Sequence, residues 1–134
     1  MLGVVRNNIQ AFLVSALVSS PAYAEPPNPC HLPGGFEFAK TKPTLLEYEC
    51  DDDSVCGVSL ESPTEIQNRS FLQFVLYFDR GNRGQINLAD QRDLNSGVVR
   101  TIFYLHSELL KVVSVDAVYE RKDGCLLVSS WYAA

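Results

Sequence analysis

The sequence predicts a small exported α+β domain, mainly antiparallel β-sheet with one or two short helices and stabilised by disulfide bonds. In several stretches, apolar and polar residues alternate at period two, as they do in strands that bury one face. Glycine- and aspartate-rich turns separate these stretches. Four cysteines follow an N-terminal segment that is typical of export. The length of 134 residues suits one domain with a modest core.

Residues 1–24 are predicted to be a signal peptide. Arg6 supplies a positive charge, residues 9–18 form an apolar run, and Ala22-Tyr23-Ala24 matches a small-x-small cleavage site. The apolar run is about half of the roughly 20 residues that a membrane span needs. We therefore expect no stable membrane span after cleavage, and a periplasmic or secreted protein.

The remaining chain divides into a lead-in and a domain. Residues 25–35 are rich in proline and should form an extended lead-in, while residues 36–134 should form a single globular domain. Within this domain, Phe36–Lys40 can form a short strand, which Pro43 would end.

The cysteines predict two disulfide bonds. Four cysteines allow three connectivities; we favour Cys50–Cys56, which closes a short loop, and Cys30–Cys125, which ties the lead-in to the C-terminal part. Neither the cysteines nor the two histidines have the paired spacing of a zinc site, and the chain has no C-x-x-C sequence. We therefore expect no metal and no cofactor.

The first predicted hairpin joins Leu45–Cys50 to Val55–Leu60 through Asp51–Ser54. Leu46, Tyr48 and Cys50 would share one face, and Glu47 and Glu49 would lie on the other as its solvated face. Calcium binding by the three consecutive aspartates is the alternative for the turn, but adjacent carboxylates do not converge easily on one ion.

A capping box in Ser62-Pro63-Thr64-Glu65 predicts a short helix that continues to Arg69. The next segment, Phe71–Phe78, has one polar position in eight and is rich in aromatic residues. This composition favours a strand that is buried on both faces.

Beyond that strand, Asp79–Gly84 is a clear turn, and Gln85–Leu88 can pair back briefly. Ala89–Ser96 is polar and should be a loop or one helical turn. Val98–Leu105 is rich in β-branched and aromatic residues, which favours a strand, although its apolar positions also fit helical spacing.

The C-terminal stretch Leu109–Trp131 is predicted to be a second hairpin. Val113, Val115, Ala117 and Tyr119 fall on one face at period two. Lys122-Asp123-Gly124 interrupts the run, and Asp-Gly is a strong signal for a tight hairpin turn because both residues tolerate positive φ.

Charge and motifs restrict the functions that fit. The net charge of −5 argues against nucleic acid and against anionic membranes as partners. His31 follows Cys30 directly, but adjacent side chains on an extended chain point apart, and Cys30 is expected in a disulfide. His106 is expected to be a surface residue in a turn, and no G-x-S-x-G motif is present. We therefore do not expect an enzyme.

We expect instead a non-catalytic exported binding protein, of the inhibitor or immunity type, that acts on another protein. Its size, charge and cysteine content are similar to those of small disulfide-bonded periplasmic inhibitors and immunity proteins. It would present an acidic surface, or Arg80, Asn82 and Arg83 in a glycine-flanked turn, to its partner.

Two alternatives remain open. The protein could be a structural or accessory subunit of a cell-envelope or secretion assembly, which predicts exposed apolar area in Phe71–Phe78 or Val98–Leu105. It could also be a small hydrolase, which would need carboxylates converging near His106. The sequence leaves the partner and the oligomeric state open.

Overall fold

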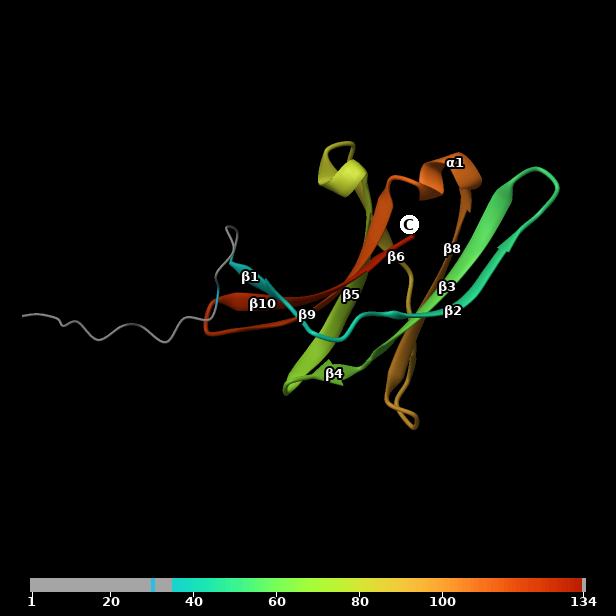
Figure 1. Ribbon diagram of the computed structural model, residues 1–134. Coiled ribbons are helices and arrows are strands. Elements are labelled where there is room, and N and C mark those ends of the chain that lie inside the picture. Colours follow the sequence, from blue (N-terminus) through green and yellow to red (C-terminus); the bar gives the residue numbers. More distant parts are fainter. Residues whose placement is uncertain (1–29, 31–34, 134) are drawn as a thin grey trace, which may run out of the picture.

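Two β-sheets packed against one another make up the fold (Figure 1). This computed structural model describes Cys30 and residues 35–133. The predicted signal peptide and most of the predicted lead-in lie outside the described residues. Within the described residues, no helix is both long and apolar enough to cross a membrane.

The two sheets have six and four strands, and the chain passes between them four times. The first sheet contains β1 (Phe36–Phe38), β10 (Cys125–Tyr132), β9 (Val113–Lys122), β5 (Arg69–Phe78) and β4 (Glu65–Ile66) in that order, with β6 (Gln85–Leu88) also on β5. The second contains β2 (Thr44–Cys50), β3 (Val55–Pro63), β8 (Val98–His106) and β7 (Gln91–Asp93). All pairings are antiparallel except that of β1 with β10.

Helix is confined to two short segments of the described chain, the 3₁₀-helix η1 (Asp79–Gly81) and the α-helix α1 (Ser107–Leu110). The prediction of mainly antiparallel sheet is therefore confirmed. The two helices are single turns that directly follow β5 and β8, so the described chain is mostly β-sheet.

The core lies between the sheets, because every central strand turns its apolar face inward. The second sheet contributes residues such as Val58, Leu60 and Phe103, and the first contributes residues such as Phe74 and Val115. Burial at alternating positions is what a two-layer β structure requires of its sequence. The outward faces of both sheets do not contribute to this core cluster.

The C-terminal hairpin is confirmed. β9 and β10 pair antiparallel, and Asp123 and Gly124 between them have φ values of 54° and 78°. Two successive positive φ values match the right-handed twist of the flanking strands. Tyr119 lies on the inward face of this hairpin, as the alternation predicts.

The predicted helix from Ser62 to Arg69 is wrong. Ser62 and Pro63 continue β3, and Gln67 and Asn68 form a tight turn with φ values of 51° and 62° between β4 and β5. β3 pairs with β8 along its whole length, and this non-local pairing outweighs the local capping signal. The predicted strand Phe71–Phe78 is confirmed as part of β5, but its expected burial on both faces is wrong near its start, where Leu72 and Gln73 are exposed.

The segment after β5 follows the prediction in part. Gln85–Leu88 pairs back on β5, and Val98–Leu105 is a strand. The expected loop or helical turn at Ala89–Ser96 is wrong for Gln91–Asp93, which pairs with β8 as β7. The wrong interpretation arose because polar residues on an exposed edge strand give no hydrophobic alternation.

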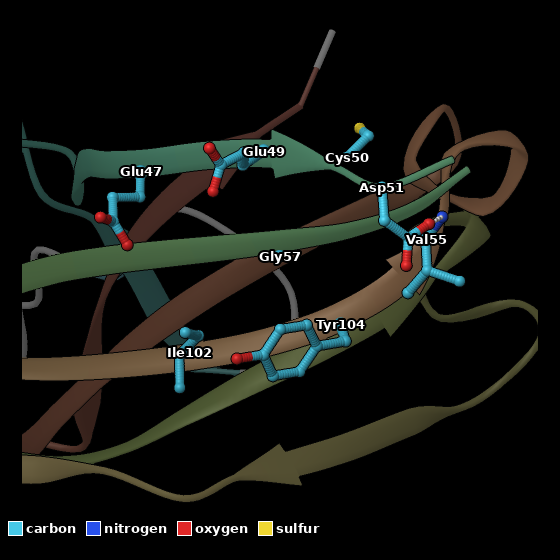
Figure 2. Close-up of a pocket in the computed structure, with 8 residues that line it drawn as sticks. All are labelled: Glu47, Glu49, Cys50, Asp51, Val55, Gly57, Ile102 and Tyr104. Atoms are coloured by element: carbon cyan, nitrogen blue, oxygen red, sulfur yellow. Dashed lines mark hydrogen bonds between the residues drawn. The ribbon is translucent and has the colours of Figure 1, made fainter. Parts of the chain in front are cut away.

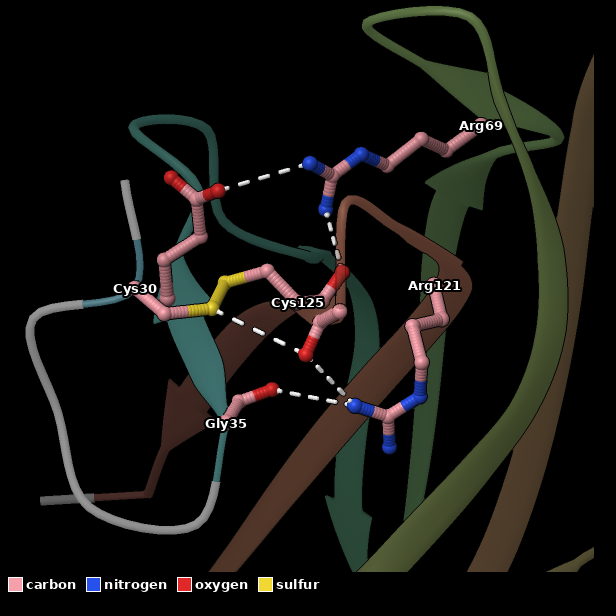
Figure 3. Close-up of polar contacts among 7 residues, drawn as sticks. Cys30, Gly35, Arg69, Arg121 and Cys125 are labelled. Atoms are coloured by element: carbon pink, nitrogen blue, oxygen red, sulfur yellow. Dashed lines mark hydrogen bonds and ion pairs between the residues drawn. A yellow bond between two sulfur atoms is a disulfide. The ribbon is translucent and has the colours of Figure 1, made fainter. Parts of the chain in front are cut away.

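The structure contains both favoured disulfide bonds, Cys30–Cys125 and Cys50–Cys56. The first links the segment before β1 to the start of β10 (Figure 3). The second closes the hairpin of β2 and β3, where the two cysteines are opposite one another. Disulfides persist in oxidising compartments, so both bonds are consistent with an extracellular environment.

Tyr119 joins the two sheets through a hydrogen bond. Its hydroxyl donates to the Pro63 carbonyl at 2.6 Å, and burial raises the pKa of Tyr119 to about 12. The pKa of Tyr119 in the folded protein is thus higher than the value of about 10 that tyrosine has in the unfolded chain. The contribution of Tyr119 to the free energy of unfolding is therefore fully present below about pH 10 and is lost as the pH rises toward 12.

We expect the free energy of unfolding to fall by roughly 2 kcal/mol between pH 10 and pH 12 because of this group. Tyr119→Phe should lower the free energy of unfolding by about 1–2 kcal/mol at neutral pH, because the hydrogen bond to Pro63 is lost. In this variant the further decrease between pH 10 and pH 12 that Tyr119 causes should be absent. Urea denaturation of both proteins at several pH values measures the difference. An unchanged alkaline slope in the variant would show that Tyr119 does not cause it.

Candidate functional site

A groove on the outward face of the second sheet is the best candidate for a functional site (Figure 2). Its volume is about 350 Å³. It is lined by carboxylates from β2 and by exposed apolar side chains from β8; the lining residues are Glu47, Glu49, Cys50, Asp51, Val55, Gly57, Ile102 and Tyr104. We call this surface the acidic groove.

Two glutamates form the acidic wall of the groove. Glu47 and Glu49 are two residues apart on β2, so both point to the same side of the strand, roughly 7 Å apart along it. β2 is an edge strand, and all seven of its residues are exposed. The predicted solvated face of the hairpin is therefore one wall of a groove.

The floor of the groove includes Gly57, the third residue of β3. Gly57 is opposite Glu49 on one side and Tyr104 on the other. A Cβ atom at position 57 would lie 2.9 Å from Tyr104 Cε1, so the ring rests on the bare backbone. Glycine inside a strand often marks such a close approach.

The apolar part of the groove is unusually exposed for large side chains. Tyr104 is 65% exposed and Ile102 is 51% exposed, both on the outward face of β8. Of these residue types, only tyrosine is enriched at protein-binding surfaces, where aspartate and glutamate are depleted.

Asp51 has a structural role at the end of the groove. Its Oδ1 accepts the backbone N–H groups of Asp53 and Val55, each at 2.9 Å. These bonds fix the turn of the hairpin, as Asp side chains commonly do. No group of three or more His, Cys, Asp or Glu residues that could hold a metal ion occurs in the described part of the chain.

The charges of the groove are not neutralised within the described chain. Arg100 lies on the same face, but its guanidinium is paired with Glu61 at 2.9 Å. Neither Glu47 nor Glu49 forms an ion pair with any residue that the structure describes. The groove can therefore accept cationic groups from another molecule.

The residues predicted to bind a partner lie elsewhere. Arg80, Asn82 and Arg83 all belong to the connection between β5 and β6, which begins with η1. Arg83 Nε is 3.6 Å from Asp79 Oδ2, in an exposed ion pair. The structure keeps these three residues together in one turn but does not bring them to the acidic groove.

His106, the centre of the hydrolase alternative, caps a helix. Its Nδ1 accepts the backbone N–H of Glu108 at 3.2 Å, at the start of α1. This bond satisfies one of the free N–H groups of the helix N-terminus.

Sequence reasoning identified part of the acidic groove and missed the rest. It placed Glu47 and Glu49 on one face but assigned them to solvent. Gly57 within a strand pattern was the available signal for a close contact. Its partner Tyr104 is 47 positions later in the chain, and only the pairing of β3 with β8 reveals it.

Comparisons of this chain with models of protein families, with curated proteins and with solved structures find no match.

Proposed function

We propose that this protein is a non-catalytic exported binding protein, of the inhibitor or immunity type, that docks its acidic groove on a cationic surface of another protein. The observation that carries the proposal is that Glu47 and Glu49, which have no ion-pair partner among the described residues, lie beside the exposed Ile102 and Tyr104 of β8. Export to the periplasm or to the outside is supported by the two disulfides.

The physical basis is complementarity on a rigid surface. Carboxylates without internal partners accelerate and orient the approach of a basic protein. Tyr104 and Ile102 then supply apolar area that is desolvated on docking, and tyrosine is enriched at binding hot spots. The groove sits on paired strands with a disulfide at one end, so little ordering is needed on binding.

The test compares two variants that lose the same charge at different places. Glu47→Gln/Glu49→Gln neutralises the groove, whereas Glu65→Gln/Asp123→Asn neutralises two exposed carboxylates in the first sheet and its turn. Immobilised wild type and both variants are incubated with envelope and secreted extracts of the source cells, and bound proteins are quantified by mass spectrometry.

We expect a basic protein that is retained by the wild type and by the control pair, and at least tenfold less by the groove variant, consistent with one or two lost charge-assisted contacts. Raising the salt concentration should weaken its retention because the interaction is electrostatic. Equal retention by the groove variant and the wild type would refute the proposal.

A second candidate function is supported by one observation. Exposed apolar area was expected in Val98–Leu105 if the protein is a subunit of an envelope assembly, and Ile102 and Tyr104 provide it. Light scattering behind size-exclusion chromatography measures this directly. A stable oligomer that Tyr104→Ser dissociates would favour the subunit function over the docking of a separate basic protein.

A further inference from the structure

A second groove lies on the outward face of the first sheet, on a different layer from the acidic groove. Its volume is about 320 Å³. The register places lining side chains in three rows across the strands: Phe38, Val128 and Val118; Ser130 and Asp116; Tyr132, Ser114 and Tyr77. Asp116 is thus the one carboxylate among the lining residues, which are otherwise apolar or aromatic apart from Ser114 and Ser130.

Asp116 is largely withdrawn from water. Ser130 Oγ donates a 2.6 Å hydrogen bond to Asp116 Oδ1. Burial raises the pKa of Asp116, and the Ser130 hydrogen bond only partly offsets this effect. No cationic side chain among the residues that the structure describes pairs with Asp116, so its desolvated negative charge has the Ser130 hydrogen bond but no compensating positive charge.

Aromatic rings border this carboxylate on two sides. Phe36 and Phe38 come from the edge strand β1, with their ring centroids 5.4 Å apart, and Tyr77 and Tyr132 lie on the opposite border. Phe38 and Tyr132 are each about half exposed. The faces of aromatic rings attract cations, and they also pack against alkyl chains.

We propose that this groove binds a small organic cation that carries a primary ammonium group on an alkyl chain. The ammonium group donates to Asp116 Oδ2, and the alkyl chain packs on the rings of β1 and on Val118 and Val128. The volume is that of a small-molecule site, and burial of the ligand cation compensates the desolvated carboxylate. This site does not depend on the acidic groove or its partner.

The experiment is an NMR titration of ¹⁵N-labelled protein with n-pentylammonium chloride, and with 1-pentanol as the neutral analogue of similar size. We expect saturable shifts at the amides of Asp116, Ser130 and Tyr77, with the alcohol binding about tenfold more weakly or worse. Equal affinities for the amine and the alcohol would overturn the proposal.

Asp116→Asn is the matched variant, because its amide oxygen still accepts the Ser130 hydrogen bond while the charge is lost. It should bind pentylammonium no better than pentanol. Its unfolding temperature should equal or exceed that of the wild type, since a desolvated charge is removed. Undiminished binding of pentylammonium by this variant would contradict a role for Asp116.

Two further titrations complete the experiment. One tests whether pentylammonium binds in the acidic groove instead, and the other tests whether the natural cation is a lysine of a protein. Glu47→Gln/Glu49→Gln should bind pentylammonium as the wild type does, and a loss there would place binding in the acidic groove instead. A short acetylated peptide with one lysine should bind no more tightly than pentylammonium. Binding about tenfold tighter would assign the groove to a protein lysine and overturn the small-molecule assignment.

Discussion

Removing the Cys30–Cys125 disulfide by the double substitution Cys30→Ala/Cys125→Ala should lower the free energy of unfolding by about 4–5 kcal/mol. The two cysteines are 95 positions apart, so the bond closes most of the domain into one loop and restricts the unfolded chain strongly. The total free energy of unfolding of a domain of this size is only about 5–15 kcal/mol. Urea denaturation monitored by Trp131 fluorescence measures the loss.

The matched control is Cys50→Ala/Cys56→Ala, which opens a loop with a separation of six positions. The same entropic model gives about 2 kcal/mol for so short a loop. β1 should also loosen in the first variant, because only three residues pair it with β10. Equal losses in the two variants would show that loop length does not determine the contribution of these bonds.

Arg69→Met should cost about 2–3 kcal/mol, the next largest effect that we expect. The Arg69 side chain is 6% exposed, and its guanidinium donates to the Cys125 carbonyl at 3.1 Å and pairs with Glu37 at 3.4 Å (Figure 3). It thereby links β5 to β10 and β1. The expected loss of free energy of unfolding is smaller than for a fully buried ion pair, because the Glu37 side chain is 25% exposed.

Arg121→Met is the control for this prediction. Arg121 lies close to the same disulfide and donates to the Gly124 carbonyl at 2.8 Å, but its side chain is exposed. Its loss should therefore cost less than about 1 kcal/mol. Thermal unfolding by circular dichroism ranks the two variants, and a smaller effect at Arg69 than at Arg121 would refute the structural role given to Arg69.

The parts of the fold that could be predicted from the sequence are those that depend on local chemistry. Asp123 and Gly124 tolerate the backbone angles of a tight turn, so the hairpin of β9 and β10 could be located from two residues. The turn at Asp51–Ser54 was predictable for a similar reason, since Asp51 bonds to the backbone of its own turn.

The errors occurred where distant parts of the chain decide the structure. Ser62 and Pro63 carry a helix-capping pattern, yet both pair with β8, about 35 positions later. Gln91–Asp93 lacks alternation and becomes a strand only because β8 offers a free edge. Neither pairing leaves a signal within the segment itself.

The same distinction applies to the two grooves. Alternation placed Glu47 and Glu49 on one face, and the period-two run from Val113 to Tyr119 leaves Asp116 on the face opposite the core. The side chains that complete the two grooves beside these carboxylates are Tyr104 and Ser130. Both belong to other strands, and only the sheet register brings them into place. Sequence therefore located the charged groups, and only the assembled sheets show which of them lack compensation.

The central proposal is that Glu47 and Glu49 contact cationic side chains of a basic partner, lysine among them. Carbodiimide forms an amide bond only between a carboxylate and an amine in direct contact, so it maps the interface without a spacer. We expect peptides cross-linked to the captured partner to contain Glu47 or Glu49 joined to a lysine. Cross-links that involve only other carboxylates, with Glu47 and Glu49 unmodified, would contradict it.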